Sequence, residues 1–155
     1  MRIALLVLHV LGAVVALGFS LTYGLWIRRG EVAGATEQAF ALRTISWIDR
    51  RFTTPAYILQ AITGVLLVAV TDWARLRQSW LEIAIGLYVL LTVLAIVRFA
   101  PAHRAQTATA ERLAAGEPLQ AEYRSAADRA QRLGVVVTAL TVAIAVLMVW
   151  KPIWW

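Results

Sequence analysis

The chain has 155 residues, and its 61% hydrophobic content and mean hydropathy of +0.70 are too apolar for a soluble domain. The net charge of +6 is carried almost entirely by arginine, and no basic run alternates with aromatic residues as a nucleic-acid groove requires. The absence of cysteine excludes disulfides, thiolate metal sites and a cysteine nucleophile. We therefore expect one membrane domain over 1–155, with the lipid bilayer as a partner and no nucleic-acid partner.

The first predicted element is a membrane span over 3–27, a run without Asp, Glu, Lys or Arg. At about 1.5 Å per residue this run crosses a hydrocarbon core of about 30 Å. Its single ionisable side chain, His9, shares one helix face with residues that favour close packing: Gly12, Ala16 and Ser20. Small residues at every fourth position let a neighbouring helix approach, so we expect this face, with His9, to point into a helix bundle.

The second region begins with an amphipathic pattern over 36–52, which predicts a helix lying at the bilayer surface. Pro55 then opens a second span over 55–71, since proline is tolerated in the first turn of a helix. A polar stripe that includes Gln60 and Gly64 marks the face of this span that we expect to pack in the bundle.

A third span is predicted over 79–100, and Pro101 is expected to kink or end it. The charged, alanine-rich stretch over 102–131 predicts a helical hairpin outside the membrane. The fourth span is predicted over 133–150. One face of it carries residues expected to pack in the bundle, among them Thr138, Thr141 and Met148.

The expected fold is all-α: an integral membrane, antiparallel four-helix bundle with an interfacial helix and a cytoplasmic helical hairpin. Eleven of the 15 Lys and Arg residues lie on the side of the two long connections. Because positive charge accumulates on the cytoplasmic side, we expect the long connections inside and both termini outside.

His9 is the strongest candidate for a functional residue, since an ionisable side chain inside a membrane is costly. The interpretation favoured by spacing alone is a neutral His9 that fixes helix packing through a hydrogen bond to Glu82, a threonine or a backbone carbonyl. The alternative is that His9 binds haem or copper, with Met148 or with a group from another helix or subunit. His103 lies in the charged stretch, where a solvated or headgroup-level side chain is expected; its role stays open.

Several short motifs are spread over nearly the whole chain: His9-Val10-Leu11-Gly12, Arg43, Pro55, Thr63-Gly64, Trp80, Pro101 and Met148-Val149-Trp150-Lys151-Pro152. They resemble those of a bacterial family of predicted integral membrane proteins, classed as a domain of unknown function. That resemblance implies a four-span protein of the bacterial inner membrane.

The first-span pattern of His9 and Gly12 is also similar to that of two other families, the copper-resistance membrane proteins and the haem-binding protoporphyrinogen oxidases of bacteria. This similarity implies haem b or copper as a cofactor at His9. In the oxidases the first-span histidine is paired with a lysine of a later span. Here the third span has no lysine, and Lys151 ends the fourth.

One membrane-embedded histidine without a catalytic constellation favours a non-enzymatic role. The leading hypothesis is a subunit or assembly factor of a larger membrane complex, with other membrane subunits or further copies of the chain as partners. The alternative is a haem- or copper-binding redox or transport protein centred on His9. A transporter acting alone is less favoured, because the chain shows no internal repeat or broken spans.

Overall fold

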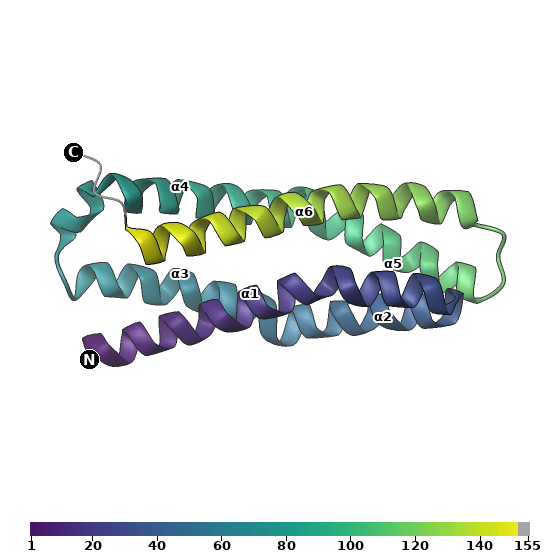
Figure 1. Ribbon diagram of the computed structural model, residues 1–155, viewed down its shortest axis with the longest axis horizontal. Helices are drawn as coiled ribbons and strands as arrows, with labels where there is room; N and C mark the ends of the chain where they lie inside the picture. Colours follow the sequence, from purple (N-terminus) through teal and green to yellow (C-terminus); the bar gives the residue numbers. More distant parts are fainter. Residues whose placement is uncertain (152–155) are drawn as a thin grey trace.

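The computed structural model describes residues 1–151, apart from the side chains of residues 74 and 75, as helices joined by short turns (Figure 1). The elements follow in the order α1 (Arg2–Ala33), α2 (Ala35–Ile48), η1 (Asp49–Thr53), α3 (Thr54–Ala69), η2 (Trp73–Arg77), α4 (Ser79–Leu94), η3 (Ala95–Phe99), α5 (Ala100–Ala114) and α6 (Gln120–Trp150). Because α2 continues through η1 into α3, and α4 through η3 into α5, they form four long helices. The predicted all-α fold is confirmed. Pro152, part of the C-terminal motif, lies outside the described residues.

Each long helix is a candidate membrane span by length and composition: Arg2–Ala33, Ala35–Ala69, Ser79–Ala114 and Gln120–Trp150. At 1.5 Å per residue the shortest of them is about 46 Å long, more than the hydrocarbon core of about 30 Å. The prediction of four candidate spans is confirmed. The exact limits of the membrane-embedded parts stay predictions.

The two long connections differ from the expectation. Residues 36–52 belong to the helix that continues into α3, and α2 packs against α1 and α5. Its buried side chains, such as Leu42 and Ile45, are thus covered by protein and not by lipid. Residues 102–131 likewise lie within α5, α6 and the turn between them. The described chain therefore shows neither a separate interfacial helix nor a cytoplasmic hairpin distinct from the candidate spans.

Two prolines are accommodated inside the long helices. Pro55 and Pro101 each follow a five-residue π turn, η1 and η3, by two positions. Proline has no N–H for the carbonyl four residues earlier, and a local π turn changes the backbone pairing at that point. The N–H of Thr54 bonds the carbonyl of Asp49, and that of Ala100 bonds the carbonyl of Ala95. The helix thus runs through Pro101 instead of ending there.

The bundle is assembled from two halves (Figure 1). In one half α1 packs on α2 and α3, and in the other α6 packs on α4 and α5. Contacts of α2 with α5 and of α1 with α6 join the halves. Within the described residues, the backbones of α3 and α4 do not pack on each other although only η2 separates them in sequence. Side chains must therefore bridge this part of the bundle.

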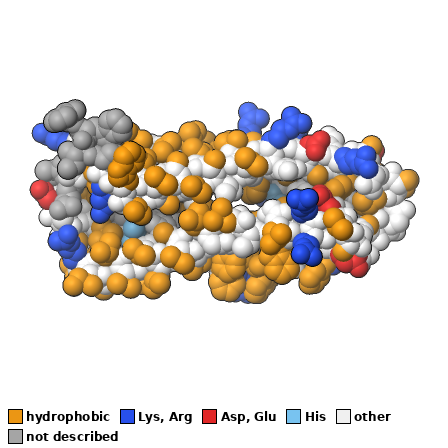
Figure 2. Space-filling model, in the orientation of Figure 1, with side chains coloured by type: hydrophobic (Ala, Val, Ile, Leu, Met, Phe, Trp, Pro, Cys, Tyr) orange, Lys and Arg blue, Asp and Glu red, His pale blue; other side chains and the backbone are white. Residues whose placement is uncertain are grey.

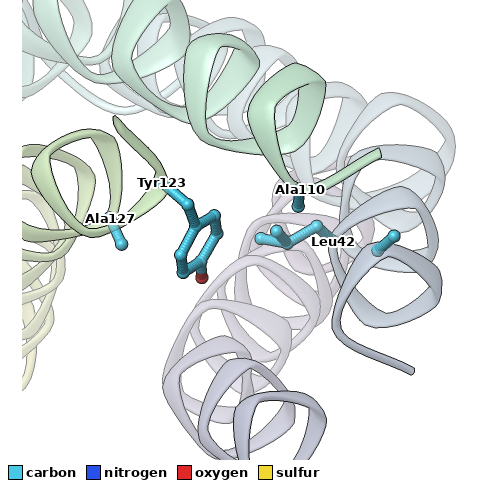
Figure 3. Packing of buried hydrophobic residues seen from close by; sticks show 5 residues of the cluster. Leu42, Ala110, Tyr123 and Ala127 are labelled. Carbon is cyan, nitrogen blue, oxygen red and sulfur yellow. The ribbon is translucent and has the colours of Figure 1, made fainter. Parts of the chain in front are cut away.

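A compact apolar cluster lies where α2, α5 and α6 meet. It consists of Ala39, Leu42, Ala110, Tyr123 and Ala127. Figure 3 shows the ring of Tyr123 between Ala127 and the side chain of Leu42, with Ala110 beside them. Leu42 and Ala110 are completely buried, since the small alanines let the three helices approach closely.

Candidate functional site

One face of the helix over 35–69 is lined with polar side chains. We call them the polar column: Ser46, Asp49, Thr53, Tyr57, Gln60 and Thr63. Steps of three and four residues place them on one side of the helix. All six are buried or half-buried, and the other long helices supply partners for all of them except Asp49, which accepts from Thr54 of its own helix. The column runs through the interior of the bundle, where polar groups have to be hydrogen-bonded to one another.

His9 lies beside Thr63 at one end of the column. Its Nδ1 is 2.8 Å from Thr63 Oγ1, and the same hydroxyl donates to the carbonyl of Leu59 at 2.6 Å. A hydroxyl has one hydrogen and a carbonyl only accepts, so Thr63 accepts from His9. This assigns the hydrogen of a neutral His9 to Nδ1 and the free lone pair to Nε2. Gln60 Nε2 donates to the backbone carbonyl of His9, which ties α1 to α3 a second time.

The small residues on the same face of α1 lie against α3. Gly12 is buried, and a Cβ there would lie 3.0 Å from Gln60 Nε2 and 3.6 Å from the carbonyl oxygen of Ala56. Ala16 is 2% exposed. On α3, a Cβ at Gly64 would lie 3.5 Å from Cε1 of His9. The glycines thus permit the close approach that sets His9 against Thr63.

Tyr57 joins four helices near the middle of the column. Its hydroxyl lies 3.0 Å from Thr141 Oγ1 on α6 and 3.4 Å from Ser20 Oγ on α1. Tyr88 of α4 donates to the backbone carbonyl of Tyr57 at 2.6 Å. Thr138, one turn before Thr141, is half-buried. The bond from Tyr88 bridges the space between α3 and α4, whose backbones do not pack on each other.

The column continues into η1. The hydroxyls of Tyr23 and Thr53 are 2.6 Å apart, and Thr53 is almost completely buried. Asp49 is half-buried, and its Oδ2 accepts from Thr54 Oγ1 at 3.3 Å. Tyr23 therefore links α1 to the π turn that precedes Pro55.

His103 lies against the far end of the column, contrary to the expected solvated side chain. It is half-buried in α5, with Nε2 3.1 Å from Ser46 Oγ and its ring stacked on Phe99 at 5.9 Å. Ser46 donates its hydrogen to the carbonyl of Leu42 at 2.9 Å, so His103 must donate from Nε2. Phe99 and His103 are four residues apart on a helix, and this spacing is the sequence signal that predicts the stacking of their rings.

A second polar cluster, missed in the sequence, lies near the α1–α2 turn. The Tyr123 hydroxyl donates to Glu31 Oε1 at 2.9 Å and accepts from Gln106 Nε2 at 3.2 Å. Gln106 is 2% exposed and Tyr123 3%. Their separation of 17 residues spans the α5–α6 turn, so only the folded hairpin brings them together.

The other residues considered with His9 have different surroundings. Met148 is half-buried on α6, Glu82 is exposed on α4, and within the described residues no hydrogen bond joins either of them to His9. Lys151 Nζ lies 5.9 Å from the ring centroid of Trp80. In the part of the chain that is described, no three His, Cys, Asp or Glu side chains are grouped to hold a metal. Haem or copper at His9 therefore stays a prediction.

Comparison with known proteins places the chain among membrane proteins. A family model described as a predicted integral membrane protein (DUF2269) matches residues 3–152. No curated protein matches the chain, and no solved structure matches it.

Proposed function

We propose that this chain, which belongs to the DUF2269 family of predicted integral membrane proteins, acts as a non-catalytic subunit or assembly factor of a larger membrane complex. The supporting observation concerns three glycines on the bundle surface. At Gly18 and Gly24 of α1 and Gly86 of α4, an added Cβ would meet no atom within 4 Å. Nothing inside the bundle requires glycine at these positions.

A glycine inside a helix costs about 0.5–1 kcal/mol relative to alanine. Gly12 and Gly30 offset this cost by letting α1 approach its neighbours, because a Cβ at either position would lie only 3.0 Å from an atom of α2 or α3. Gly18 has no such internal contact and lies between the exposed Val14 and Leu21. Close approach of a helix from another protein would explain why glycine is present at Gly18, because small residues mark contact faces between membrane helices.

The proposed placement in the bilayer follows from the charge distribution. Figure 2 shows charged side chains gathered in the half with the α1–α2 turn and at the opposite tip, with hydrophobic side chains dominating between them. Most of the arginines belong to the first of these regions. We place that half on the cytoplasmic side of a bacterial inner membrane, with η2 and both termini outside.

Association is tested by extracting the tagged protein from its native membrane in a mild detergent and measuring the mass of the particle. The subunit proposal expects a complex well above the 17.1 kDa chain. Gly18→Leu and Gly86→Leu should release the chain from it, whereas Ala61→Leu, also at an exposed small residue, should not. A chain that runs alone after gentle extraction would contradict the proposal.

A second candidate function is haem or copper binding at His9. The observation that favours it is the bond to Thr63, which orients the imidazole and leaves Nε2 free, as an outer-shell partner does for a metal ligand. His9 would supply one ligand, and the second would come from another subunit or from Met148 of the same chain. An absorption spectrum of the purified protein, oxidised and then reduced, should show haem bands that His9→Ala abolishes. Absence of these bands together with absence of copper by elemental analysis would reject this candidate.

A further inference from the structure

One exposed face of α2 and η1 carries arginine and tryptophan. Arg43, Trp47, Arg50 and Arg51 are all exposed. At 100° per residue they lie within an arc of about 100°, which begins about 80° around the helix from the buried Leu42. We call these four residues, together with Phe52 and Phe19, the arginine–aromatic face.

Three aromatic rings from different elements form a continuous apolar surface on this face. The ring centroids of Phe19 and Phe52 are 5.7 Å apart, and those of Trp47 and Phe52 are 5.8 Å apart in an edge-on arrangement. Trp47 is 53% exposed and Phe52 45%. In Figure 2 hydrophobic side chains protrude at the lower edge of the molecule near its middle, over the region of α1 and α2.

The guanidinium groups of this face form no ion pair among the described residues, where the ion pair that forms joins Arg112 to Glu117. Arg50 Nε donates to the backbone carbonyl of Ser46 at 3.2 Å, which leaves its other donors free. The nearest carboxylate in sequence, Asp49, accepts from Thr54 and interacts electrostatically with Arg50. Three exposed cations thus stand on one helix face next to a single carboxylate.

The level of this face along the helix fits the headgroup layer of a bilayer. From Phe52 to Val70 the helix carries no charged residue over about 27 Å, close to the thickness of the hydrocarbon core. Arg50 and Arg51 follow directly beyond that stretch, and Trp47 lies about one turn further. Tryptophan and arginine are the side chains typical of the membrane–water interface.

We propose that the arginine–aromatic face binds an anionic phospholipid. The guanidinium forks of Arg50 and Arg51 hold the phosphate, since their planar donors match two phosphate oxygens. The rings of Phe19 and Phe52 receive the upper part of an acyl chain. A lipid with net negative charge is favoured over a zwitterionic one, because the three arginines outnumber Asp49, the single carboxylate next to them. Lipid binding at this face needs membrane embedding but not the subunit role.

Thermal unfolding in neutral detergent tests the proposal. The melting temperature of the full-length chain is measured with dioleoyl-phosphatidylglycerol or with dioleoyl-phosphatidylcholine at equal mole fraction. A ligand that binds the folded state raises the melting temperature, so the anionic lipid should raise it more than the zwitterionic lipid does. Arg50→Gln combined with Arg51→Gln should lose most of this difference. Arg112→Gln combined with Arg124→Gln removes the same charge near the α5–α6 turn. This control pair should keep the difference in melting temperature between the two lipids.

Two further arms make the test decisive. Arg50→Lys with Arg51→Lys keeps the charge but not the fork, and should keep only part of the difference. Soluble glycerol phosphate at the same concentration should leave the melting temperature unchanged, whereas a rise would assign the site to free phosphate. Equal effects of the two lipids on the unmodified chain, or an equal loss in the control pair, would overturn the proposal. Even if the glutamine variants fail to fold, the unmodified chain shows whether the anionic lipid raises the melting temperature more than the zwitterionic lipid does.

Discussion

The hydroxyl groups inside the bundle share a bonding pattern. Ser20, Ser46, Thr63 and Thr141 each donate to the carbonyl four residues earlier in their own helix. Their single hydrogens are therefore engaged, and they face the neighbouring helices as acceptors. The donors between helices are consequently imidazoles, phenols and the amides of Gln60 and Gln106. In the described residues no buried side-chain nitrogen or oxygen lacks a partner.

This pattern predicts opposite tautomers for the two histidines. His9 should carry its hydrogen on Nδ1 and His103 on Nε2, because each faces a hydroxyl whose hydrogen is already donated. Solid-state NMR of ¹⁵N-histidine-labelled protein in lipid, at a pH where both rings are neutral, distinguishes the two forms by the nitrogen shifts. His9→Gln and His103→Gln assign the signals. The same tautomer at both sites would contradict the scheme.

Tyr57 should contribute measurably to stability. Tyr57→Phe removes the hydroxyl between Thr141 and Ser20, and interhelical bonds of this kind contribute about 0.6 kcal/mol on average and up to about 2 kcal/mol. Thr92→Val is the control, since the exposed Thr92 bonds only its own helix, at the carbonyl of Tyr88. Reversible unfolding in mixed micelles should show a loss for the first variant and little change for the second.

His9 could be predicted to face inward because it shares a helix face with small residues in an otherwise apolar run. Its partner Thr63 could be foreseen only as one of several threonines, since pairing between distant helices leaves no local trace. His103, expected to be solvated or at headgroup level, is half-buried in the structure, because a charged, alanine-rich stretch has the same composition whether it faces solvent or a packed helix. The contact with Ser46 exists only because α2 and α5 pack together.

At the level of elements, the amphipathic pattern over 36–52 predicts a helix, and the structure shows it as part of a longer helix packed in the bundle. An apolar stripe has the same spacing whether it faces lipid or a neighbouring helix. The pattern predicts the helix but does not decide between these surroundings. Pro101 likewise marks an irregular position, and the structure resolves it as a π turn within a continuous helix.

The turn between α1 and α2 depends on Gly34. Its φ of 137° and ψ of 173° lie in a region that only glycine adopts readily, and a Cβ there would be 2.9 Å from Glu37 Oε2. Gly34→Ala should therefore destabilise the protein by about 1–3 kcal/mol. Gly24→Ala, at an open position inside α1, should be neutral or stabilising by up to about 1 kcal/mol in detergent. Equal losses for both variants would contradict the backbone argument.

For the whole molecule, the charged half is as much a part of the packed bundle as the apolar half. The cluster around Leu42 and Tyr123 joins α2, α5 and α6 in the region where the sequence predicts separate surface elements. The four spans themselves are predictable, because long apolar runs are a strong local signal. Which helices pair is not, since α2 and α5 are joined by contacts between residues distant in sequence.

The packed charged half predicts a strong effect at Leu42. Leu42→Ala should cost about 2–5 kcal/mol, because the residue is completely buried and its removal leaves a cavity. Phe40→Ala removes a larger side chain that is 59% exposed, and should cost much less in detergent. Chemical denaturation of both variants measures the difference. A small effect at Leu42 would mean that 36–52 is not packed against α5.

The orientation proposed for the whole bundle, which crosses the bilayer with its charged half on the cytoplasmic side, can be measured directly. Since the chain has no cysteine, single cysteines can be placed at will, one at Trp73 in η2 and one at Ala115 in the α5–α6 turn. A membrane-impermeant maleimide added to intact cells should label Trp73→Cys, and should label Ala115→Cys only after permeabilisation. Labelling of both positions from the same side, or of Ala115→Cys alone from outside, would contradict this orientation.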